Sequence, residues 1–563
     1  MDDRALRIEH RSGPAGAVVY AEGRPLTGPD PALSMPRRLP DPRGVLPQTL
    51  FLIPSPLHGF GLSPWICDLP ISCTVLLVEL DPDLAQLQPQ IATWPHHRRI
   101  VAVTSWGDAV RAADRLISRH ASRRVRTVHL SGGSHLHRDA YHELEAQIAA
   151  IIQRYWSNRG TQIRLHRRWI ANLLRNVALE GSSVEVLRGS GARRAILVGA
   201  GPSLDLHLSM LSRLFSSSGP GTADRAGGIL VAIDTALPTL AAANIQPDFV
   251  VTMDSQLVNA QDFLPWQWDS IAVIADATTH FSIPRRFRTS RRYWFVSRFS
   301  EIQLFTDPQL SALFAGIPVI PPVGSVAPSA IHILSNIMGI SEILLVGVDF
   351  WYRPPKSHAG MSSSDRWLKK ATARIRHRDG HDRAPARPVR DIQLQDGTRT
   401  VGDAILYDHA QLTRDVVTRS AARIVQVPTA GLDIGAESIP PSEVAAWWNT
   451  ASSSASGHTP DRSNTPTSTP ASVQGHPPTT AVRVTALEAL FHRLRVLEDR
   501  LQSDTTPPIL DAGLDFVLVD LPQWPLMTLS PEWMSLHRLR ILRSVRDYRR
   551  RVETLLFRRS AQD

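Results

Sequence analysis

The sequence predicts an α/β protein with two Rossmann-like, doubly wound parallel-sheet domains and a C-terminal helical region. The chain has 563 residues, which is too many for a single hydrophobic core. Short runs of Val, Ile and Leu alternate with helical patterns along most of it, as is typical of βαβ units. Leucines spaced three and four residues apart near the C-terminus predict additional helices.

Residues 1–138 are predicted to form the N-terminal Rossmann-like domain. After an irregular, Pro-rich opening to about Pro47, four short apolar runs are suited to strands buried on both faces of a parallel sheet. These runs are 49–53, 74–80, 99–104 and 126–130. Residues 139–192 form a helical connector, in which apolar side chains from Leu144 to Tyr155 recur at helical spacing.

Residues 193–440 are predicted to form a larger central domain of alternating strands and helices. Strands are expected at 195–198, 228–233, 248–253, 271–275, 292–297 and 342–348, and helices at 204–214, 236–243 and 326–338. A polar, basic insertion follows at 352–400, which indicates either a binding loop or disorder. A final helix and strand within 410–427 close the domain.

The C-terminal part is predicted to begin with a disordered linker at 451–480, because its Ser, Thr and Pro residues cannot bury enough apolar area to fold. The C-terminal helical region, 481–563, contains leucines from Leu487 to Leu501 at helical spacing and an Arg-rich helical stretch at 531–557. We expect it to pack on the central domain or on a second subunit, so a homo-oligomer is possible. A specialised membrane role is the alternative.

Composition and charge narrow the class of protein. The formal net charge is +10, but the basic residues are spread along the chain, so nucleic-acid binding is not expected. Cys67 and Cys73 are the only cysteines, which argues against a disulfide framework and indicates a reducing compartment. No stretch reaches the length of an apolar membrane helix, and the first residues lack an apolar signal segment. We therefore expect a cytoplasmic protein without a membrane span.

A glycine-containing turn follows the first strand of the central domain, in the segment AILVGAGPSLD at 195–205. Gly199 and Gly201 permit a tight turn, and with Pro202 they lead to Ser203 at the start of a helix, where backbone N–H groups can hold a phosphate. The rival interpretation is a dinucleotide-binding fingerprint. Leu204 stands where its third glycine would be, which weakens that interpretation. A purely structural turn is also open.

Small and acidic residues follow several other predicted strands. The residues at these positions are Asp234, Thr235, Asp254, Gly324, Ser325 and Asp349. Because the carboxyl ends of parallel strands meet at one edge of a sheet, these residues are expected to converge on one ligand-binding crevice. For any one of them the simpler explanation is a helix cap, above all for Asp234.

The loop 353–359, which follows Asp349, contains Lys356 and His358. A lysine and a histidine can neutralise a departing phosphate and exchange a proton near neutral pH. Lys356 is one of three lysines among 62 basic residues, which fits a need for a compact charge at this position. Chance retention of a surface lysine is the alternative.

Read in order, the segments GAGPSLD, AIDTALPTLAAANIQPDFVVTMDSQ, VGSVAPSAIHILSNIMGISEILLVGVDF, KSHAGM and VPTAGLDIG resemble the motility-associated factor (Maf) glycosyltransferase-like family. This family shares its central domain with 6-hydroxymethylpterin diphosphokinase-like proteins. The resemblance covers about 193–435. The N-terminal region also looks like the Rossmann-like domain of Maf proteins, although PSPLHGFGL stands where the family tends to have a Gly-rich turn.

The resemblance implies a glycosyltransferase that moves a nonulosonic, sialic-acid-like sugar from a CMP-activated donor to Ser or Thr of flagellin. By motif, the donor site would be lined by Gly199, Gly201, Ser203, Asp234, Asp254, Ser325, Asp349, Lys356 and His358. Asp349 and His358 are candidates for accepting the acceptor's proton, with Lys356 aimed at the phosphate. No cofactor or metal is expected, because a lone acid such as Asp254 makes a poor metal site.

Two other functions remain open. A 6-hydroxymethylpterin diphosphokinase-like enzyme would transfer diphosphate from ATP and would require Mg²⁺. A non-catalytic flagellin-binding protein or chaperone would keep the fold without the chemistry.

Overall fold

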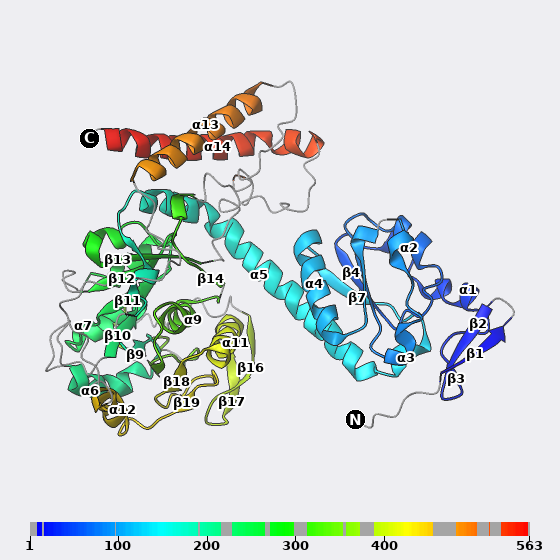
Figure 1. The fold of residues 1–563 in the computed structure, drawn as a ribbon, viewed down its shortest axis with the longest axis horizontal. Coiled ribbons are helices and arrows are strands. Elements are labelled where there is room, and N and C mark those ends of the chain that lie inside the picture. Colours follow the sequence, from blue (N-terminus) through cyan, green and yellow to red (C-terminus); the bar gives the residue numbers. More distant parts are fainter. Residues whose placement is uncertain are drawn as a thin grey trace, which may run out of the picture. The chain divides into compact units, whose positions relative to one another are not determined.

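The structure, a computed structural model, describes residues 8–13, 16–95, 97–189, 192–215, 228–264, 271–297, 312–321, 323–352, 356–371, 388–453, 480–503, 517 and 531–560. The chain divides into two compact units (Figure 1). One comprises Met1–Arg164 and Leu518–Leu536, and the other comprises Leu165–Val517 and His537–Asp563. Most of the expected linker, 454–479, lies outside the described residues.

The first unit contains a four-stranded parallel sheet in the order β6-β5-β4-β7. Its strands are β4 (Thr49–Pro54), β5 (Thr74–Val78), β6 (Ile100–Val103) and β7 (Arg124–Thr127). Alternate residues of β4 face opposite sides: Phe51 packs in the core that includes α2 (Leu62–Asp68), and Leu50 in the core that includes α4 (Trp106–His120). The Rossmann-like α/β class expected for this region is therefore confirmed.

The opening of the chain was expected to be irregular, but the structure shows regular elements there. Strands β1 (Ile8–Gly13), β2 (Gly16–Ala21) and β3 (Arg24–Pro25) form a small antiparallel sheet. The short helix α1 (Pro31–Ser34) follows, and Asp30 caps it by accepting a hydrogen bond from Leu33 N at 3.1 Å. Closely spaced Gly and Pro residues concealed these short strands, whose pairing depends on tight turns.

The second unit is built on a ten-stranded sheet in the order β14-β13-β12-β11-β10-β9-β15-β18-β19, with β8 also paired to β13. Every pairing in this sheet is parallel. The strands are β8 (Ser182–Ser183), β9 (Arg194–Val198), β10 (Gly228–Ile233), β11 (Phe249–Thr252), β12 (Ala272–Asp276), β13 (Arg292–Ser297), β14 (Val319–Ile320), β15 (Glu342–Val346), β18 (Arg423–Gln426) and β19 (Glu437–Ser438). From β9 the chain proceeds outward to β14, then returns to place β15 on the other side of β9. The order of strands therefore reverses between β9 and β15.

Helices cover both faces of this sheet (Figure 1). On one face, Ile196 and Val198 of β9 pack with residues of α6 (Leu204–Phe215), α7 (Leu237–Ala242) and α12 (Val444–Ser453). On the other face, Ala195 and Leu197 pack with α9 (Val326–His332) and α11 (Ala404–Arg419). Burial of each such Leu, Ile or Val contributes roughly 1.5–3 kcal/mol, so the apolar strand runs stabilise the doubly wound architecture.

The polar insertion contains regular structure that the sequence analysis did not identify. Helix α10 (Ser363–Ala371) is followed by an antiparallel hairpin of β16 (Val389–Gln393) and β17 (Arg399–Asp403). Most residues of these two strands are exposed or half-buried, with Ile392 and Gly402 as the buried exceptions, so they carry little apolar signal. Residues 353–355 and 372–387 of the insertion lie outside the described part.

The C-terminal region is helical, as expected, with α13 (Thr480–Gln502) and α14 (Pro531–Ser560). Glu498 of α13 accepts hydrogen bonds from Arg546 at 2.8 Å and from Arg549 at 2.7 Å, which join the two helices. Among the described residues, no helix has both the length and the apolar character needed to span a membrane.

Strands β9 and β15 approach each other closely where they end. A Cβ added to Gly199 would lie 2.5 Å from Gly347 O, and one added to Gly347 would lie 2.6 Å from Gly199 O. Gly347 also has a positive φ of +70°, which ends β15 two residues earlier than predicted. Both glycines are therefore required by the packing of these turns.

Replacing Gly199 by Ala should destabilise the protein by about 1–3 kcal/mol, because the new methyl group has no room beside Gly347. Gly160→Ala is the matched control, since that glycine lies within α5 (Arg138–Val177) with no atom near its Cβ position. We expect the control to be neutral or stabilising by up to about 1 kcal/mol. Urea unfolding of both variants measures the difference, and equal stabilities would contradict the packing argument.

Candidate anion-binding site at the carboxyl edge of the central sheet

Ser203 and Asp349 lie together at the point where strand order reverses. Ser203 follows the turn after β9, and Asp349 follows β15. The Ser203 backbone N–H donates to one carboxylate oxygen of Asp349 at 2.8 Å, and its hydroxyl donates to the other at 2.5 Å. Both residues are buried. Ser203 and Asp349 were predicted to lie at one edge of the sheet, and the structure brings them into contact.

The turn that was expected to hold a phosphate thus holds a carboxylate of the same chain. Burial raises the pKa of Asp349, while the two hydrogen bonds from Ser203 oppose that rise. Gly201 allows this approach, because a Cβ at that position would lie 2.5 Å from Asp349 Cγ. Pro202 lies between Gly201 and Ser203 in the turn. An external anion could reach the Ser203 N–H only if Asp349 moved away.

The loop that carries Lys356 and His358 lies against the same turn. Lys356 forms an ion pair with Asp205 in the first turn of α6. The Gly360 N–H also donates to Asp205, at 2.9 Å, and the Ala359 N–H donates to Ala200 O at 2.9 Å. The His358 ring contacts the hydroxyl of Ser357 through Nδ1 at 3.0 Å. The three predicted catalytic residues, Asp349, Lys356 and His358, are therefore grouped around the β9 turn.

Asp234 and Thr235 lie at the end of β10 and are committed to local structure. Asp234 is 2% exposed and accepts hydrogen bonds from Thr252 Oγ1 and from the Thr235 N–H, each at 2.8 Å. Burial raises the pKa of Asp234 to about 7. This carboxyl group joins the ends of β10 and β11 and is almost fully buried.

Asp254, Gly324 and Ser325 lie at the same edge. Asp254 accepts hydrogen bonds from the Gln256 N–H at 2.8 Å and from Asn259 Nδ2 at 2.7 Å, which shape the turn after β11. Gly324 has a φ of +80° and lies against Leu412 of α11. Ser325 precedes α9 without capping it. Asp254 follows β11, whereas Gly324 and Ser325 follow β14.

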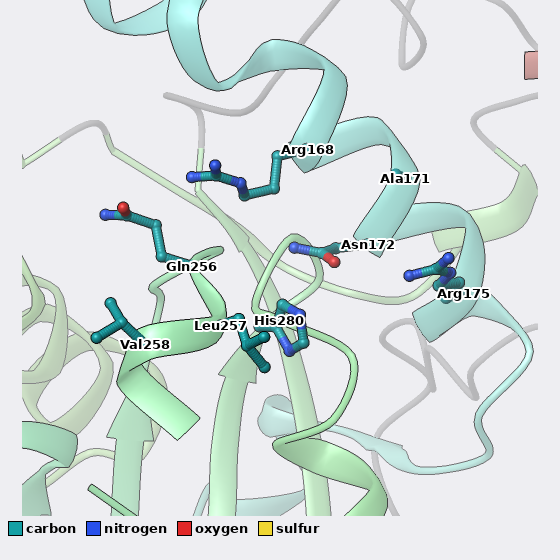
Figure 2. Close-up of a pocket in the computed structure, with 8 residues that line it drawn as sticks. All are labelled: Arg168, Ala171, Asn172, Arg175, Gln256, Leu257, Val258 and His280. Atoms are coloured by element: carbon teal, nitrogen blue, oxygen red, sulfur yellow. The ribbon is translucent and has the colours of Figure 1, made fainter. Parts of the chain in front are cut away.

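A cavity of about 370 Å³ opens at this edge, next to the ends of β11 and β12 (Figure 2). One wall is the C-terminal part of α5 (Arg138–Val177), and the other is formed by the turns that follow the two strands. The lining residues are Arg168, Ala171, Asn172, Arg175, Gln256, Leu257, Val258 and His280. All of them belong to the second unit.

Two asparagines fix this helix wall to the sheet. Asn172 Nδ2 donates to Ser255 O at 3.0 Å and to Thr278 O at 3.1 Å. One turn later, Asn176 Nδ2 donates to Ala277 O at 2.9 Å and to Thr279 O at 2.7 Å. The two buried amides thus satisfy four carbonyl groups of the turns after β11 and β12.

Arg168 and Arg175 lie on the same helix face as Asn172, at steps of four and three residues. Figure 2 shows their guanidinium groups on either side of the Asn172 side chain. The Arg175 guanidinium lies 4.3 Å from the ring centroid of Phe281. Two arginines beside a cavity at the carboxyl ends of parallel strands suit an anionic ligand, since Arg binds phosphate and carboxylate in a bidentate manner.

The charges of the cavity also act on its titratable neighbours. Burial, together with the positive charges of Arg175 and Arg168, lowers the pKa of His280. Burial raises the pKa of Asp254, against the hydrogen bonds from Gln256 and Asn259 and the charge of Arg168. Within the described part of the chain, no group of three or more His, Cys, Asp or Glu residues is arranged to hold a metal ion.

The carboxyl edge of the central sheet lies within a segment that matches a known protein family. Residues 167–354 match the family model described as 6-hydroxymethylpterin diphosphokinase MptE-like. The solved structure of the MAf glycosyltransferase from Magnetospirillum magneticum AMB-1 aligns with a TM-score of 0.52 over 99% of this chain and 92% of that one, at 13% identity. The chain has the fold of a Maf glycosyltransferase. The Maf-like and MptE-like resemblance is therefore confirmed.

One further comparison concerns sequence alone. An uncharacterized protein of Treponema pallidum (strain Nichols) is 25% identical over 344 residues, which cover 59% of this chain. The match spans 57% of the relative's own length, a little over half. The matched MptE-like segment contains the cavity residues as well as Ser203 and Asp349.

The residues that line the cavity were not predicted from the sequence. Arg168, Asn172 and Arg175 lie within the segment that was interpreted as a connector, although their spacing places them on one helix face. His280 follows β12, and applying the same strand-end argument to that strand would have identified it. Gln256 stands two residues after Asp254, within a quoted motif.

Replacing Asp234 by Asn should reduce the dependence of stability on pH. The folded protein retains a proton on Asp234 up to about pH 7, whereas a free aspartate loses it near 3.8. The Asp234 carboxyl group therefore makes its full contribution to the free energy of unfolding below about pH 4. That contribution is lost as the pH rises through 7. Relative to wild type, the variant should gain on the order of a few kcal/mol of unfolding free energy between about pH 4 and pH 8. Urea denaturation over that range tests this, and a difference independent of pH would contradict it.

Proposed function

We propose that the protein is a glycosyltransferase that uses a nucleotide-activated sugar and binds the anionic part of that donor in the cavity between α5 and the ends of β11 and β12. The observation that carries the proposal is the pair Arg168 and Arg175 on the wall of this cavity. In open α/β sheets, ligands bind outside the carboxyl ends of the strands, and this cavity lies there.

The arginine pair suits the chemistry of transfer. When the bond between the sugar and the phosphate breaks, negative charge develops on a phosphate oxygen and positive charge on the sugar. Preorganised guanidinium groups stabilise that oxygen without having to reorient during the reaction. Because Asn172 lies between the two arginines and is bonded to Ser255 O and Thr278 O, the helix face that carries them is fixed.

In its finer form, the proposal is transfer of a nonulosonic, sialic-acid-like sugar from its CMP-activated form to Ser or Thr of flagellin, in the cytoplasm and without a metal. The support is the ordered set of motifs that resembles Maf proteins, together with the shared fold. Asp349, Lys356 and His358 remain proposed contributors, because they surround the β9 turn at the same edge.

The match to the MptE-like family model favours one second candidate, a 6-hydroxymethylpterin diphosphokinase-like activity. Such an enzyme would transfer diphosphate from ATP and would depend on Mg²⁺. The same cavity could then receive the anionic chain of ATP. The two candidates differ in nucleotide and in metal requirement, so binding measurements distinguish them.

Calorimetric titration of the full chain with CMP, and separately with ATP and Mg²⁺, tests the proposal. We expect CMP to bind, and we expect the double variant Arg168→Gln, Arg175→Gln to bind it at least about tenfold more weakly, because each lost charge-assisted hydrogen bond costs about 1.5–3 kcal/mol. Arg419→Gln is the control, since this exposed residue ends α11 and does not line the cavity.

Binding of ATP with Mg²⁺ in place of CMP would favour the diphosphokinase. Binding of neither nucleotide would contradict both enzymes. Mass spectrometry of flagellin from cells with and without this protein then tests the acceptor, and identical flagellin masses would exclude it.

Lys356→Gln should lower the rate of sugar transfer by about tenfold or more, because it removes the cation that pairs with Asp205 beside the β9 turn. Lys369→Gln is a matched control, since Lys369 pairs with Asp365 on an exposed turn of α10. Rates of CMP release from a CMP-activated sugar measure both variants. If both retain the wild-type rate, Lys356 has no part in the reaction.

A further inference from the structure

His280 occupies a defined position on the cavity wall. It follows β12 by four residues, and its backbone N–H donates to Asp254 O at 3.0 Å. Its ring packs against Phe281 with 4.7 Å between centroids. Figure 2 shows the imidazole among the side chains that line the cavity, across from the face of α5 that carries Arg168 and Arg175. Contacts within the turn after β12 therefore set the position of the imidazole.

Ser282 fixes the tautomer of the neutral ring. The Ser282 backbone N–H donates to Nδ1 of His280 at 3.4 Å, and the Ser282 hydroxyl lies 2.8 Å from the same atom. A backbone N–H can only donate, so Nδ1 is an acceptor, and the neutral ring carries its proton on Nε2. The Nε2–H group of His280 is therefore a hydrogen-bond donor.

The Nε2 edge of the ring is the edge available to a ligand. Ser282, which holds Nδ1, does not line the cavity, whereas His280 does. Within the part of the chain that the structure describes, no residue accepts a hydrogen bond from Nε2. A donor without a partner beside two arginines suits an anion, whose oxygens accept hydrogen bonds.

The charged groups around His280 keep the ring neutral. Burial lowers the pKa of His280, and the positive charges of Arg175 and Arg168 lower it further. On the same side of the cavity as His280, Arg285 lies over the adjacent phenyl ring. The cations oppose a further positive charge, so the ring is neutral above about pH 6.5. A neutral ring can still donate through Nε2–H.

We propose, on the basis of the proposed function, that His280 is a catalytic residue whose Nε2–H donates to the phosphate oxygen that leaves the sugar. The bond between the anomeric carbon and that oxygen breaks, and its electron pair stays on the oxygen. The acceptor oxygen bonds to the carbon and releases its proton to water. The imidazole proton stays on Nε2 throughout, so His280 acts neither as an acid nor as a base. Ser282 acts as a positioning residue by holding Nδ1.

His280 and the two arginines contribute at different stages of the transfer. The guanidinium groups of Arg168 and Arg175 attract the charge that the phosphate already carries in the donor. The hydrogen bond from His280 strengthens most as new charge develops on the leaving oxygen. Only an interaction that is stronger in the transition state than in the bound donor raises kcat. A neutral imidazole can stabilise a developing oxyanion in this way.

Calorimetric titration of the full chain with CMP at about pH 7.5 tests the hydrogen bond, because the phosphate is then mostly a dianion. His280→Phe keeps a ring and removes the donor, so it should weaken CMP binding by about tenfold or more. His280→Gln can place an amide N–H near the Nε2 position and should bind CMP within about threefold of wild type. Arg419→Gln should match wild type. His280→Leu provides a second variant without the donor, and matching thermal unfolding curves exclude misfolding.

The rate of CMP release from CMP-N-acetylneuraminic acid tests the catalytic step. His280→Phe should lower kcat by about 10²–10³-fold with little change in KM, and His280→Gln should restore most of the loss. The ratio of wild-type kcat to that of His280→Phe should stay constant between about pH 6.5 and 8.5, because the neutral ring is the donor. Ser282→Ala should lower kcat in the wild-type chain and have no further effect in His280→Gln, which has no Nδ1.

CMP binding by His280→Phe that is as tight as wild type would overturn the role of His280 and leave the proposed function intact. Binding by His280→Gln that is as weak as in His280→Phe would do the same. A contribution of His280 that disappears as the pH rises would also overturn it, since imidazolium would then be the active form. Failure of the wild-type chain to bind CMP would instead overturn the proposed function, and the role of His280 with it. If the wild-type chain binds CMP but does not release it from this sugar, the calorimetric comparison decides.

Discussion

Four hydrogen bonds from the amides of Asn172 and Asn176 hold the C-terminal part of α5 against the carboxyl ends of β11 and β12. The acceptors are carbonyl groups of buried residues in the turns after the two strands. Removing such a donor costs about 1–3 kcal/mol for each group left unsatisfied. The cavity, its two arginines and the setting of His280 all depend on this attachment, because the helix that carries Arg168 and Arg175 forms one wall of the cavity.

The β9 turn shows how a familiar local pattern acquires a different use. In a dinucleotide-binding protein, the N–H groups after such a turn receive a pyrophosphate. Here Ser203 donates both its N–H and its hydroxyl to Asp349, and Gly199 and Gly201 leave room for β15 and that carboxylate to approach. The glycines thus allow contact between neighbouring strands. Leu204, which stands where a third glycine would be, is the first residue of α6 and is buried in the core that includes β9, β10 and α7.

The central sheet could be predicted because its strands are buried on both faces and read as continuous apolar runs, such as 228–233, where the predicted bounds match β10. Ser203 and Asp349 could be placed at one edge for the same reason, since the ends of parallel strands coincide. The cavity could not be predicted from the sequence. Arg168 indicates a binding site only when α5 is known to lie against the ends of β11 and β12. The hairpin of β16 and β17 was missed because its mostly exposed residues lack an apolar period.

Two groups of polar residues lie along the carboxyl edge of the central sheet, one around the β9 turn and the other lining the cavity at the ends of β11 and β12. They lie far enough apart to act on different parts of a substrate. Neighbouring strands are about 4.8 Å apart, so the two or three strand spacings from β9 to the β11–β12 ends correspond to roughly 10–14 Å. Between them, Asp234 is buried and bonded to Thr252 and Thr235, so it offers no charge to a ligand that crosses β10. A phosphate held by Arg168 and Arg175 would therefore lie on the β11–β12 side of the edge. Lys356 and His358 would act on whatever extends beyond β10, which favours a role for them in binding the more distant part of the donor or the acceptor.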